Sequence, residues 1–317
     1  MRRIIIGADG GGTKTRLAAL DADTLQPVAS AVCGSIHWLS MGVPAAAREL
    51  EKGIASLGLG SDDSIAAVSV GDPSVEDSDT SPGEEFIKLA VKVSAPEAAI
   101  FSKSDVFTAL YAFSRGQPAA LLVAGTGSMG VALTEPFDFS RPARLFTVGG
   151  WGEPARDPGS GYHAALSAIA AALDAFDGIG EKTALCGEVL GWFEAGKPRD
   201  LIDIFNSGSQ PRAFVAGFAQ RVEECADAGD AVAGRILFNE GETLGKYALS
   251  LLGALPPGKK RLGIYGGFFT KCRAVRETAE KTVRKEYPDA EIAEPEIPAQ
   301  VGAALYAADA LKAEENK

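Results

Sequence analysis

The sequence predicts an α/β protein made of two similar domains with a cleft between them. The first observation is a repeated order, because each half begins with a strand, a turn of glycine and hydroxyl residues, and two further strands. The second is the alternation of helices and strands that follows, which favours an α/β architecture. The third is the length of 317 residues, which is long for one hydrophobic core and sufficient for two.

The first half predicts the element order βββαβαβα. Its opening strand, 4–6, is a short aliphatic run that leads directly into glycines, and the later strands are also apolar. The expected helices carry apolar or small residues at helical spacing, and Glu84 and Glu85 suit a helix N-terminus. After the first strand we expect strands at 15–21, 28–32, 65–70 and 99–101, and helices at 44–57, 82–91 and 105–115.

The second half predicts the same opening. A strand at 119–124 leads into a second turn of glycine and hydroxyl residues at 125–128. We expect two domains: residues 1–117 together with the returning helix of 298–317, and residues 118–297 with a helical insert. The remaining elements expected are strands at 131–133, 145–148 and 261–265, the insert at 160–252, and helices at 271–284 and 298–312.

The stretch from Asp9 to Thr13 has the composition of a phosphate-binding loop. A strand followed by several glycines can bring backbone amides against an anion. Asp9 suits a Mg²⁺ ion accompanying that anion, since Mg²⁺ favours one or two carboxylates plus phosphate oxygens. The loop is not a Walker motif, because Thr13 separates Lys14 from the last glycine, and its spacing does not match the dinucleotide fingerprint. It joins two antiparallel strands instead, and a plain hairpin turn remains the alternative.

Composition argues against several classes of protein. Lysine and arginine number 31 against 42 aspartates and glutamates, and a net charge of −11 argues against a nucleic-acid partner. No run of about 18 apolar residues is free of charge or glycine, so no membrane span is expected, and the N-terminus has too few aliphatics for a signal peptide. Two histidines argue against a His-based zinc site. The widely spaced cysteines, which fit a reducing cytoplasm, are Cys33, Cys186, Cys225 and Cys272.

Several segments together resemble one superfamily. The stretches GADGGGTKT (7–15), AGTGS (124–128) and YGGFF (265–269) resemble the two phosphate segments and the adenosine segment of the actin/hexokinase/Hsp70 superfamily. The stretches 35–39, 149–152, 157–162 and 214–244 bring the chain closer to the N-acetylglucosamine kinases and the related BadF/BcrA-type ATPase family. This resemblance implies duplicated ribonuclease H-like (actin-like ATPase) domains, each a mixed five-stranded sheet flanked by helices.

The resemblance also implies an activity: an ATP-dependent kinase that phosphorylates the 6-hydroxyl of N-acetylglucosamine or glucosamine, with ATP and Mg²⁺ as cofactors. Asp105 falls where these kinases place the carboxylate that accepts the proton of the sugar hydroxyl, and Asp9 would hold Mg²⁺ through water. Relatives are often homodimers, so a cytoplasmic homodimer is expected. ATP would bind Gly11, Gly12, Thr13, Lys14, Gly125, Thr126, Gly127, Gly266 and Gly267, and the sugar would bind His37, Trp38, Asp72, Ser128 and Asp157.

Purely structural roles remain open for several of these residues. Asp105 begins a predicted helix, where acidic residues also serve as caps. Trp38 could belong to the core, and His37 could be bonded within its own loop. Asp157 could serve only to fix the glycine-rich turn that follows it, and Lys14 could be solvated.

Three positions depart from the kinase pattern. Ile36 stands where the kinases usually carry asparagine, Met129 where they often carry a polar residue, and Pro158 where glutamate is more common. The first two changes remove possible hydrogen bonds, so the choice among N-acetylglucosamine, glucosamine and another hexose stays open.

Two functions other than kinase activity also remain open. One is an ATP-driven activator of a partner reductase, which the isolated cysteines disfavour because such activators hold an iron–sulfur cluster with close cysteines. The other is a sugar-binding regulator without catalysis, which would need a DNA-binding element that this acidic chain does not show.

Overall fold

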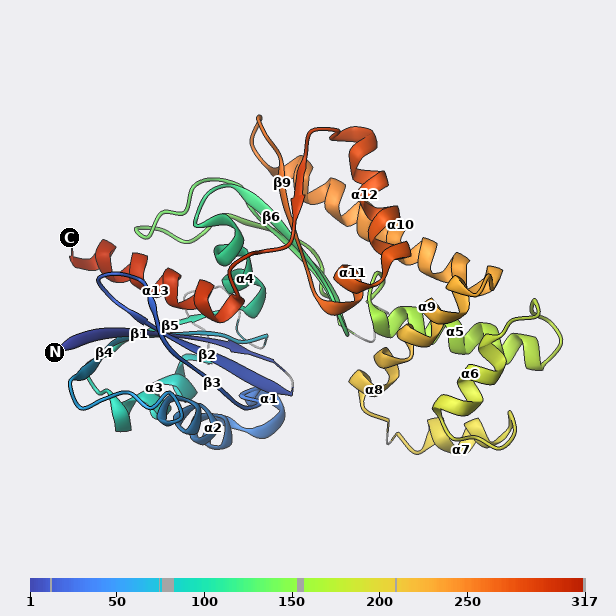
Figure 1. The fold of residues 1–317 in the computed structure, drawn as a ribbon, viewed down its shortest axis with the longest axis horizontal. Helices are drawn as coiled ribbons and strands as arrows, with labels where there is room; N and C mark the ends of the chain where they lie inside the picture. Colours follow the sequence, from blue (N-terminus) through green and yellow to red (C-terminus); the bar gives the residue numbers. More distant parts are fainter. Residues whose placement is uncertain (12, 74, 76–82, 153–156, 209, 316–317) are drawn as a thin grey trace. The chain divides into compact units, whose positions relative to one another are not determined.

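The computed structural model describes residues 1–11, 13–73, 75, 83–152, 157–208 and 210–315, and it divides into two compact units (Figure 1). Unit 1 comprises Met1–Leu121, Leu133–Leu145 and Pro295–Lys317, and unit 2 comprises Leu122–Ala132 and Phe146–Glu294. Relative to the predicted domains, unit 1 also includes the segment 133–145 and the short stretches 118–121 and 295–297. Phe137 and Phe139 explain the grouping of the segment 133–145, because their rings lie 5.7 and 5.6 Å from the ring of Tyr306 in unit 1.

The two sheets have the same strand order, which confirms the predicted duplication. The first sheet is ordered β3-β2-β1-β4-β5 and the second β10-β9-β6-β7-β8. Read from its other edge, the second becomes β8-β7-β6-β9-β10, so β6 takes the place of β1 and β9 takes the place of β4. Each glycine turn therefore follows the central strand of its sheet.

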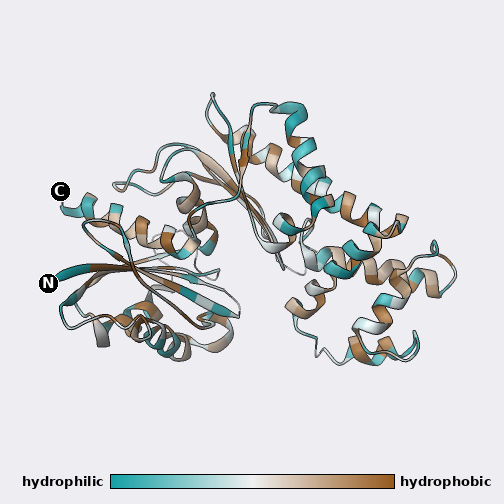
Figure 2. Cartoon of the chain, viewed as in Figure 1, coloured by the Kyte–Doolittle hydropathy of each residue, from teal (hydrophilic) through white to brown (hydrophobic). Residues whose placement is uncertain are grey.

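The first sheet is mixed. β1 pairs antiparallel with β2, and β2 with β3, whereas β1, β4 and β5 run parallel. Figure 2 shows β1 hydrophilic at its start and hydrophobic along the rest, as expected for a central strand buried on both faces. The strands are β1 (Arg2–Gly10), β2 (Lys14–Asp21), β3 (Pro27–Gly34), β4 (Asp63–Gly71) and β5 (Ala99–Lys103).

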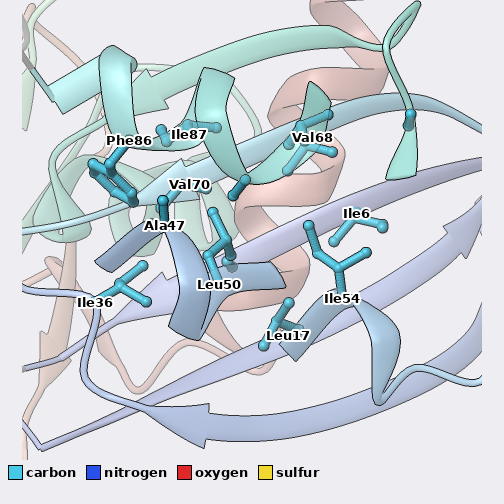
Figure 3. Packing of buried hydrophobic residues seen from close by; sticks show 14 of the residues in the cluster. Ile6, Leu17, Ile36, Ala47, Leu50, Ile54, Val68, Val70, Phe86 and Ile87 are labelled. Atoms are coloured by element: carbon cyan, nitrogen blue, oxygen red, sulfur yellow. The ribbon is translucent and has the colours of Figure 1, made fainter. Parts of the chain in front are cut away.

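Helices cover both faces of this sheet. On one face α2 and α3 enclose a core in which Leu50, Ile54 and Phe86 meet the strand residues Ile6 and Val68 (Figure 3). On the other face α4 and α13 enclose a second core rich in aromatic rings. The helices of unit 1 are α1 (Trp38–Met41), α2 (Val43–Ala55), α3 (Gly83–Ser94), α4 (Asp105–Ser114) and α13 (Ala299–Glu315).

The C-terminal helix α13 packs close to its neighbours because two glycines lie at the contacts. Gly7 of β1 faces the helix, and Gly302 is part of the helix. A Cβ atom added at Gly7 of β1 would overlap the Gln300 carbonyl oxygen and the Ala304 amide of α13. A Cβ atom added at Gly302 would lie 2.5 Å from the carbonyl oxygen of Thr108 and 2.6 Å from the Cβ of Ala112, both in α4. Helix α13 therefore packs closely against both β1 and α4.

Unit 2 contains most of the second sheet and a set of helices in the predicted insert. Gly241 and Gly245 of α10 face Thr278 and Thr282 of α12, so the same four-residue spacing on both helices brings their backbones together. The strands are β6 (Ala119–Ala124), β7 (Ser128–Leu133), β8 (Leu145–Gly149), β9 (Arg261–Tyr265) and β10 (Glu291–Ala293). The helices are α5 (Gly161–Phe176), α6 (Leu185–Trp192), α7 (Asp200–Asn206), α8 (Arg212–Gly217), α9 (Ala219–Asp227), α10 (Ala231–Ala254), α11 (Gly267–Lys271) and α12 (Arg273–Glu286).

Most predicted elements are present, and the differences have simple causes. The sequence does not predict β10, because this three-residue strand is specified by its pairing with β9 through Ile292 and Leu262. The helix expected at 271–284 is present as α12, and the short helix α11 that precedes it, ending at Lys271, was not predicted. Among the helices that the structure describes, none has the length and apolar character to cross a bilayer.

We expect Gly302→Ala to destabilise the protein. The added methyl group would press on α4, and overpacking of this kind costs about 1–3 kcal/mol. The measurement is the midpoint of urea denaturation, followed by circular dichroism, compared with the unchanged protein.

Gly234→Ala is the matched control, because Gly234 is also helical and no atom lies within 4 Å of an added Cβ. This variant should gain about 0.5–1 kcal/mol from improved helix propensity. Equal midpoints for the two variants would contradict the close packing of α13 on α4.

Candidate functional site

Three aspartates lie at one edge of the sheet in unit 1. Asp9, Gly71 and Lys103 are register partners at the ends of the parallel strands β1, β4 and β5. Asp72 directly follows β4, and Asp105 follows β5 after one residue. Because the carboxyl ends of parallel strands meet at the same edge, Asp9, Asp72 and Asp105 are brought together there. This edge is where open α/β sheets bind their ligands.

Asp9 is a carboxylate in surroundings that disfavour its charge. Its side chain is 16% exposed. Burial raises its pKa above the usual value, and Arg16, whose Nη1 lies 3.9 Å from Oδ2, opposes that rise. The ionised form is therefore costly in the protein alone, and a bound cation would relieve that cost. A carboxylate oxygen suits Mg²⁺.

The first glycine loop is a tight turn between β1 and β2. The Gly11 amide donates to the carbonyl oxygen of Lys14 at 3.1 Å, and the Ser35 hydroxyl donates to the carbonyl oxygen of Gly11 at 2.9 Å. Thr13 and Lys14 are exposed, and Gly12 lies outside the described residues. The segment that begins at Ser35 is thus tied directly to the loop.

Asp105 is the first residue of α4, but its helix cap is a different residue. The hydroxyl of Ser104 accepts from the Phe107 amide at 3.1 Å and forms the N-cap. Oδ1 of Asp105 accepts from the Val106 amide at 2.8 Å, and the N-terminal end of the helix favours the ionised carboxylate. A Cβ atom added at Gly71 would lie 3.2 Å from the Cα of Asp105, so the missing side chain of Gly71 lets α4 approach the end of β4.

The remaining candidate residues of unit 1 lie at or near this edge. Asp72 is fully buried, and its amide donates to the Lys103 carbonyl oxygen at 3.0 Å. His37 Nδ1 lies 3.0 Å from the hydroxyl of Ser40, and that hydroxyl donates to the His37 carbonyl oxygen at 2.9 Å, so the ring is held within its own turn. Trp38 packs partly against the first core, and its buried Nε1 has no acceptor among the described residues.

The second glycine loop, in unit 2, is held from two sides. The Gly125 amide donates to the Gly127 carbonyl oxygen at 2.8 Å, and the Gly161 amide donates to the Gly125 carbonyl oxygen at 2.9 Å. The Ser128 hydroxyl donates to the Pro158 carbonyl oxygen at 2.7 Å. The loop that follows Asp157 therefore fixes the shape of the glycine loop.

Asp157 is part of a buried ion pair. It is 5% exposed, and its Oδ2 lies 2.6 Å from Nη2 of Arg212. The guanidinium of Arg212 also lies over the ring of Tyr162, 5.2 Å from its centroid. A Cβ atom added at Gly127 would lie 2.6 Å from Oδ2 of Asp157, so the carboxylate rests against the glycine loop. The ion pair therefore supports the second glycine loop, and it places the charges of Asp157 and Arg212 beside that loop.

A pocket of ≈ 600 Å³ lies in unit 2 beside the second glycine loop. Its size is within the range of small-molecule sites. Gly266 is the N-cap of α11 and has a φ of 96°, and a Cβ atom there would lie 2.5 Å from the Ala124 carbonyl oxygen. Only glycine therefore allows the turn after β9 to meet the end of β6 at the pocket. The pocket is lined by Gly125, Thr126, Gly161, Ala213, Ala216, Gly217, Ala219, Gln220, Glu223, Gly267, Phe268, Lys271 and Cys272.

The structure gathers the sequence-predicted residues into two groups. One is the sheet edge of unit 1 with Asp9, Asp72 and Asp105, and the other is the pocket of unit 2 with Gly125, Thr126 and Gly267. Sequence reasoning missed Arg212, Gln220, Glu223 and Lys271. The sequence contains little indication of a ligand site there. Residues 220 and 223 lie three apart on a charged stretch that resembles an ordinary solvent-exposed helix.

Comparison with known proteins identifies relatives over the full length of the chain. Residues 6–307 match the model of the BadF/BadG/BcrA/BcrD ATPase family. The chain is 27% identical to the N-acetyl-D-glucosamine kinase of Dictyostelium discoideum, with 98% of this chain and 99% of the relative aligned. It is 25% identical to the N-acetylmuramic acid/N-acetylglucosamine kinase of Clostridium acetobutylicum, over 96% and 98% of the two chains.

A solved structure supports the fold. A protein from Chromobacterium violaceum superimposes with a TM-score of 0.72 at 24% identity, covering 97% of this chain and 99% of the other. The shared architecture confirms the predicted fold class of two five-stranded sheets flanked by helices.

We expect Arg212→Met to destabilise the protein, because it leaves the Asp157 carboxylate buried without its counter-charge. Removing one partner of a buried pair costs about 3–5 kcal/mol, and we expect roughly 2–4 kcal/mol here since Arg212 is 36% exposed. The midpoint of chemical denaturation is the measurement.

The double variant Asp157→Asn/Arg212→Met removes both charges and should recover part of the loss. Asparagine tolerates the positive φ of 44° at position 157. A double variant no more stable than Arg212→Met alone would show that the ion pair is not what stabilises this loop.

Proposed function

The chain belongs to the BadF/BadG/BcrA/BcrD ATPase family, and we propose that it is an ATP-dependent sugar kinase that phosphorylates the 6-hydroxyl of N-acetylglucosamine or glucosamine. The observation that carries the proposal is the sheet edge of unit 1, beside a glycine loop. Asp9 lies near the end of β1 and Asp105 lies just after β5, and these two parallel strands flank β4. The full-length relatives with kinase activity on amino sugars support the substrate class.

Asp105 is the proposed general base. A sugar hydroxyl is a poor nucleophile until a positioned base accepts its proton, and such a base contributes about 100- to 10,000-fold to the rate. The carboxylate takes the hydroxyl proton as the oxygen attacks the γ-phosphorus, and the bond from phosphorus to the bridging oxygen breaks to release ADP. The N-terminal end of α4, where Asp105 lies, favours the ionised carboxylate, which is the form that can accept a proton.

Asp9 is the residue proposed to hold Mg²⁺ beside the phosphates, through water. When bound, the ion would neutralise charge on the transferring phosphoryl group. The carboxylate fits this role, because it is largely buried, is an oxygen donor, and lies next to the first glycine loop. The backbone of Gly11, Gly12, Thr13 and Lys14 would line the same side of the phosphates.

The pocket of unit 2 is the proposed nucleotide site. Gly125, Thr126 and Gly127 would line the phosphates, with the backbone amides of Thr126 and Gly127 as the proposed donors. Gly266 and Gly267 would let the adenosine lie close to the chain, and Phe268 offers it an apolar surface.

The proposed sugar-binding residues are His37, Trp38, Asp72, Ser128 and Asp157. The buried Nε1 of Trp38 supports its role, because an indole N–H with no acceptor among the described residues can donate to a hydroxyl. Asp157 would contact the sugar through an oxygen not used by Arg212, so we expect Arg212 to limit how strongly this aspartate binds hydroxyl groups.

Release of ADP from ATP in the presence of Mg²⁺, measured with a panel of sugars, tests the proposal. N-acetylglucosamine, glucosamine, N-acetylmuramic acid and glucose should be compared, with product position assigned by NMR. We expect turnover that depends on an amino sugar and phosphorylation at the 6-position. ATP hydrolysis that no sugar stimulates would refute the proposal and would favour an activator of a partner reductase.

We expect Asp105→Asn to lower kcat by about 100- to 10,000-fold, because the amide cannot accept the proton. The dissociation constant for ATP should change little, since the nucleotide pocket lies in other elements. Steady-state kinetics and calorimetric titration with ATP provide the two measurements.

Asp200→Asn is the matched control, because Asp200 is also the first residue of a helix, α7, outside the proposed site. This control should keep full activity. An Asp105→Asn enzyme with unchanged kcat would remove Asp105 from the role of base.

A further inference from the structure

We infer that Ser35 couples binding of the sugar to binding of the ATP phosphates, and is therefore a positioning residue for the proposed reaction. The inference rests on the proposed function, in which the first glycine loop binds phosphate and His37 and Trp38 bind the sugar. It assigns a role to a side chain that lies between these two segments and belongs to neither proposed set of contacts.

Strand pairing places the two segments side by side within unit 1. The glycine loop ends where β2 begins, at Lys14, and the segment that leads to His37 starts where β3 ends, at Gly34. Lys14 and Gly34 are register partners in the antiparallel pair of β2 and β3. The chain that leaves β3 therefore starts directly beside the loop.

The Ser35 hydroxyl connects the two segments as both a donor and an acceptor. It donates to the Gly11 carbonyl oxygen at 2.9 Å, and its oxygen accepts from the His37 amide at 3.2 Å. Both distances lie within the range of protein hydrogen bonds. A serine that bonds a nearby backbone amide is a common turn, whereas the bond to Gly11 spans 24 residues. This second bond ties the sugar segment to the phosphate loop.

The residues on either side of Ser35 are anchored, so the hydroxyl has a defined position. The Gly34 amide donates to Oε1 of Glu49 in α2 at 2.8 Å. Ile36 is fully buried, and a Cβ atom added at Gly10 would lie 3.0 Å from its Cδ1. The side chain of Ile36 thus packs under the start of the loop, next to the bond that Ser35 makes.

Two physical effects make this hydroxyl a coupling element. Hydrogen bonds in a chain polarise one another, so a firmly held His37 amide strengthens the donation from Ser35 to Gly11. A peptide unit is planar, so holding the Gly11 carbonyl oxygen orients the backbone of the loop at that point. A sugar that orders His37 and Trp38 therefore lowers the cost of ordering the loop around phosphate, and the reverse follows by thermodynamic linkage.

Calorimetric titration of the unchanged protein provides the first test. The acceptor is whichever of N-acetylglucosamine and glucosamine supports turnover, titrated with and without saturating AMP-PNP and Mg²⁺. The ratio of the two dissociation constants is the coupling factor. We expect the sugar to bind about fivefold or more tightly when AMP-PNP is present. A coupling factor of one would overturn the inference.

The variant Ser35→Ala provides the second test. It removes both hydrogen bonds of the hydroxyl and should lower the coupling factor by about threefold or more, which is the scale of one hydrogen bond. Ser35→Thr keeps the hydroxyl and should keep the coupling factor of the unchanged protein. A Ser35→Ala protein with native circular dichroism and an unchanged coupling factor would overturn the inference, because the coupling would then arise elsewhere, as from closure of the domains.

Ser40→Ala is the matched control. The Ser40 hydroxyl also bonds to His37, donating to its carbonyl oxygen at 2.9 Å, and among the described residues it makes no hydrogen bond to the glycine loop. Sugar affinity in this control should change by the same factor with and without AMP-PNP. The same pattern in Ser35→Ala would indicate a purely structural role for Ser35 and would also contradict the inference.

The proposed function and this inference fail in different ways. A protein that binds neither amino sugar and releases no ADP in response to them would refute the proposed function, and the inference with it. Sugar-dependent release of ADP, combined with a coupling factor that Ser35→Ala leaves unchanged, would refute the inference alone.

Discussion

Close contact between helices and the sheet at glycine positions is the constraint on which the site in unit 1 depends. Gly7 lets α13 lie directly on β1, and Gly302 lets the same helix lie directly on α4. At Gly71 an added Cβ would overlap the hydroxyl of Thr108 and approach the backbone of Asp105. A side chain at Gly71 would push α4 away from the end of β4, and a side chain at Gly302 would push α4 and α13 apart. The aspartate at the N-terminus of α4 would move with it.

Unit 2 achieves a comparable rigidity with buried polar groups. Asp157 and Arg212 support the second glycine loop from one side. Glu240, which is 2% exposed, accepts from the Gly159 amide at 2.7 Å, and its Oε1 lies 2.7 Å from Nδ1 of His163. Buried charges of this kind are costly unless they are paired and hydrogen-bonded. Their presence on both sides of the turn at 157–161 indicates that the shape of this turn matters for the function.

The two units therefore contribute different chemistry to the proposed reaction. Unit 1 supplies carboxylates at the end of a parallel set of strands, where proton transfer and cation binding need them. Unit 2 supplies backbone amides, small residues and a few polar side chains, which are suited to a large ligand that carries its own charge. The same strand order underlies both, so the difference arises from the residues after the strands. Asp72 follows β4, whereas Gly266 follows the equivalent strand β9.

The sequence alone determined the duplicated fold, both glycine turns and the positions of Asp9 and Asp105, because each of these is encoded in a short contiguous pattern. Strand periodicity, glycine runs and a helix start all act over a few residues, so reading along the chain is sufficient. Tertiary structure alone decided the partners of those residues. Asp157 and Arg212 are separated by 55 positions in the chain, Glu223 meets the pocket only because α9 packs beside the start of α12, and β10 exists only as a partner of β9. Such contacts depend on how elements pack in three dimensions, and no local pattern of residues specifies them.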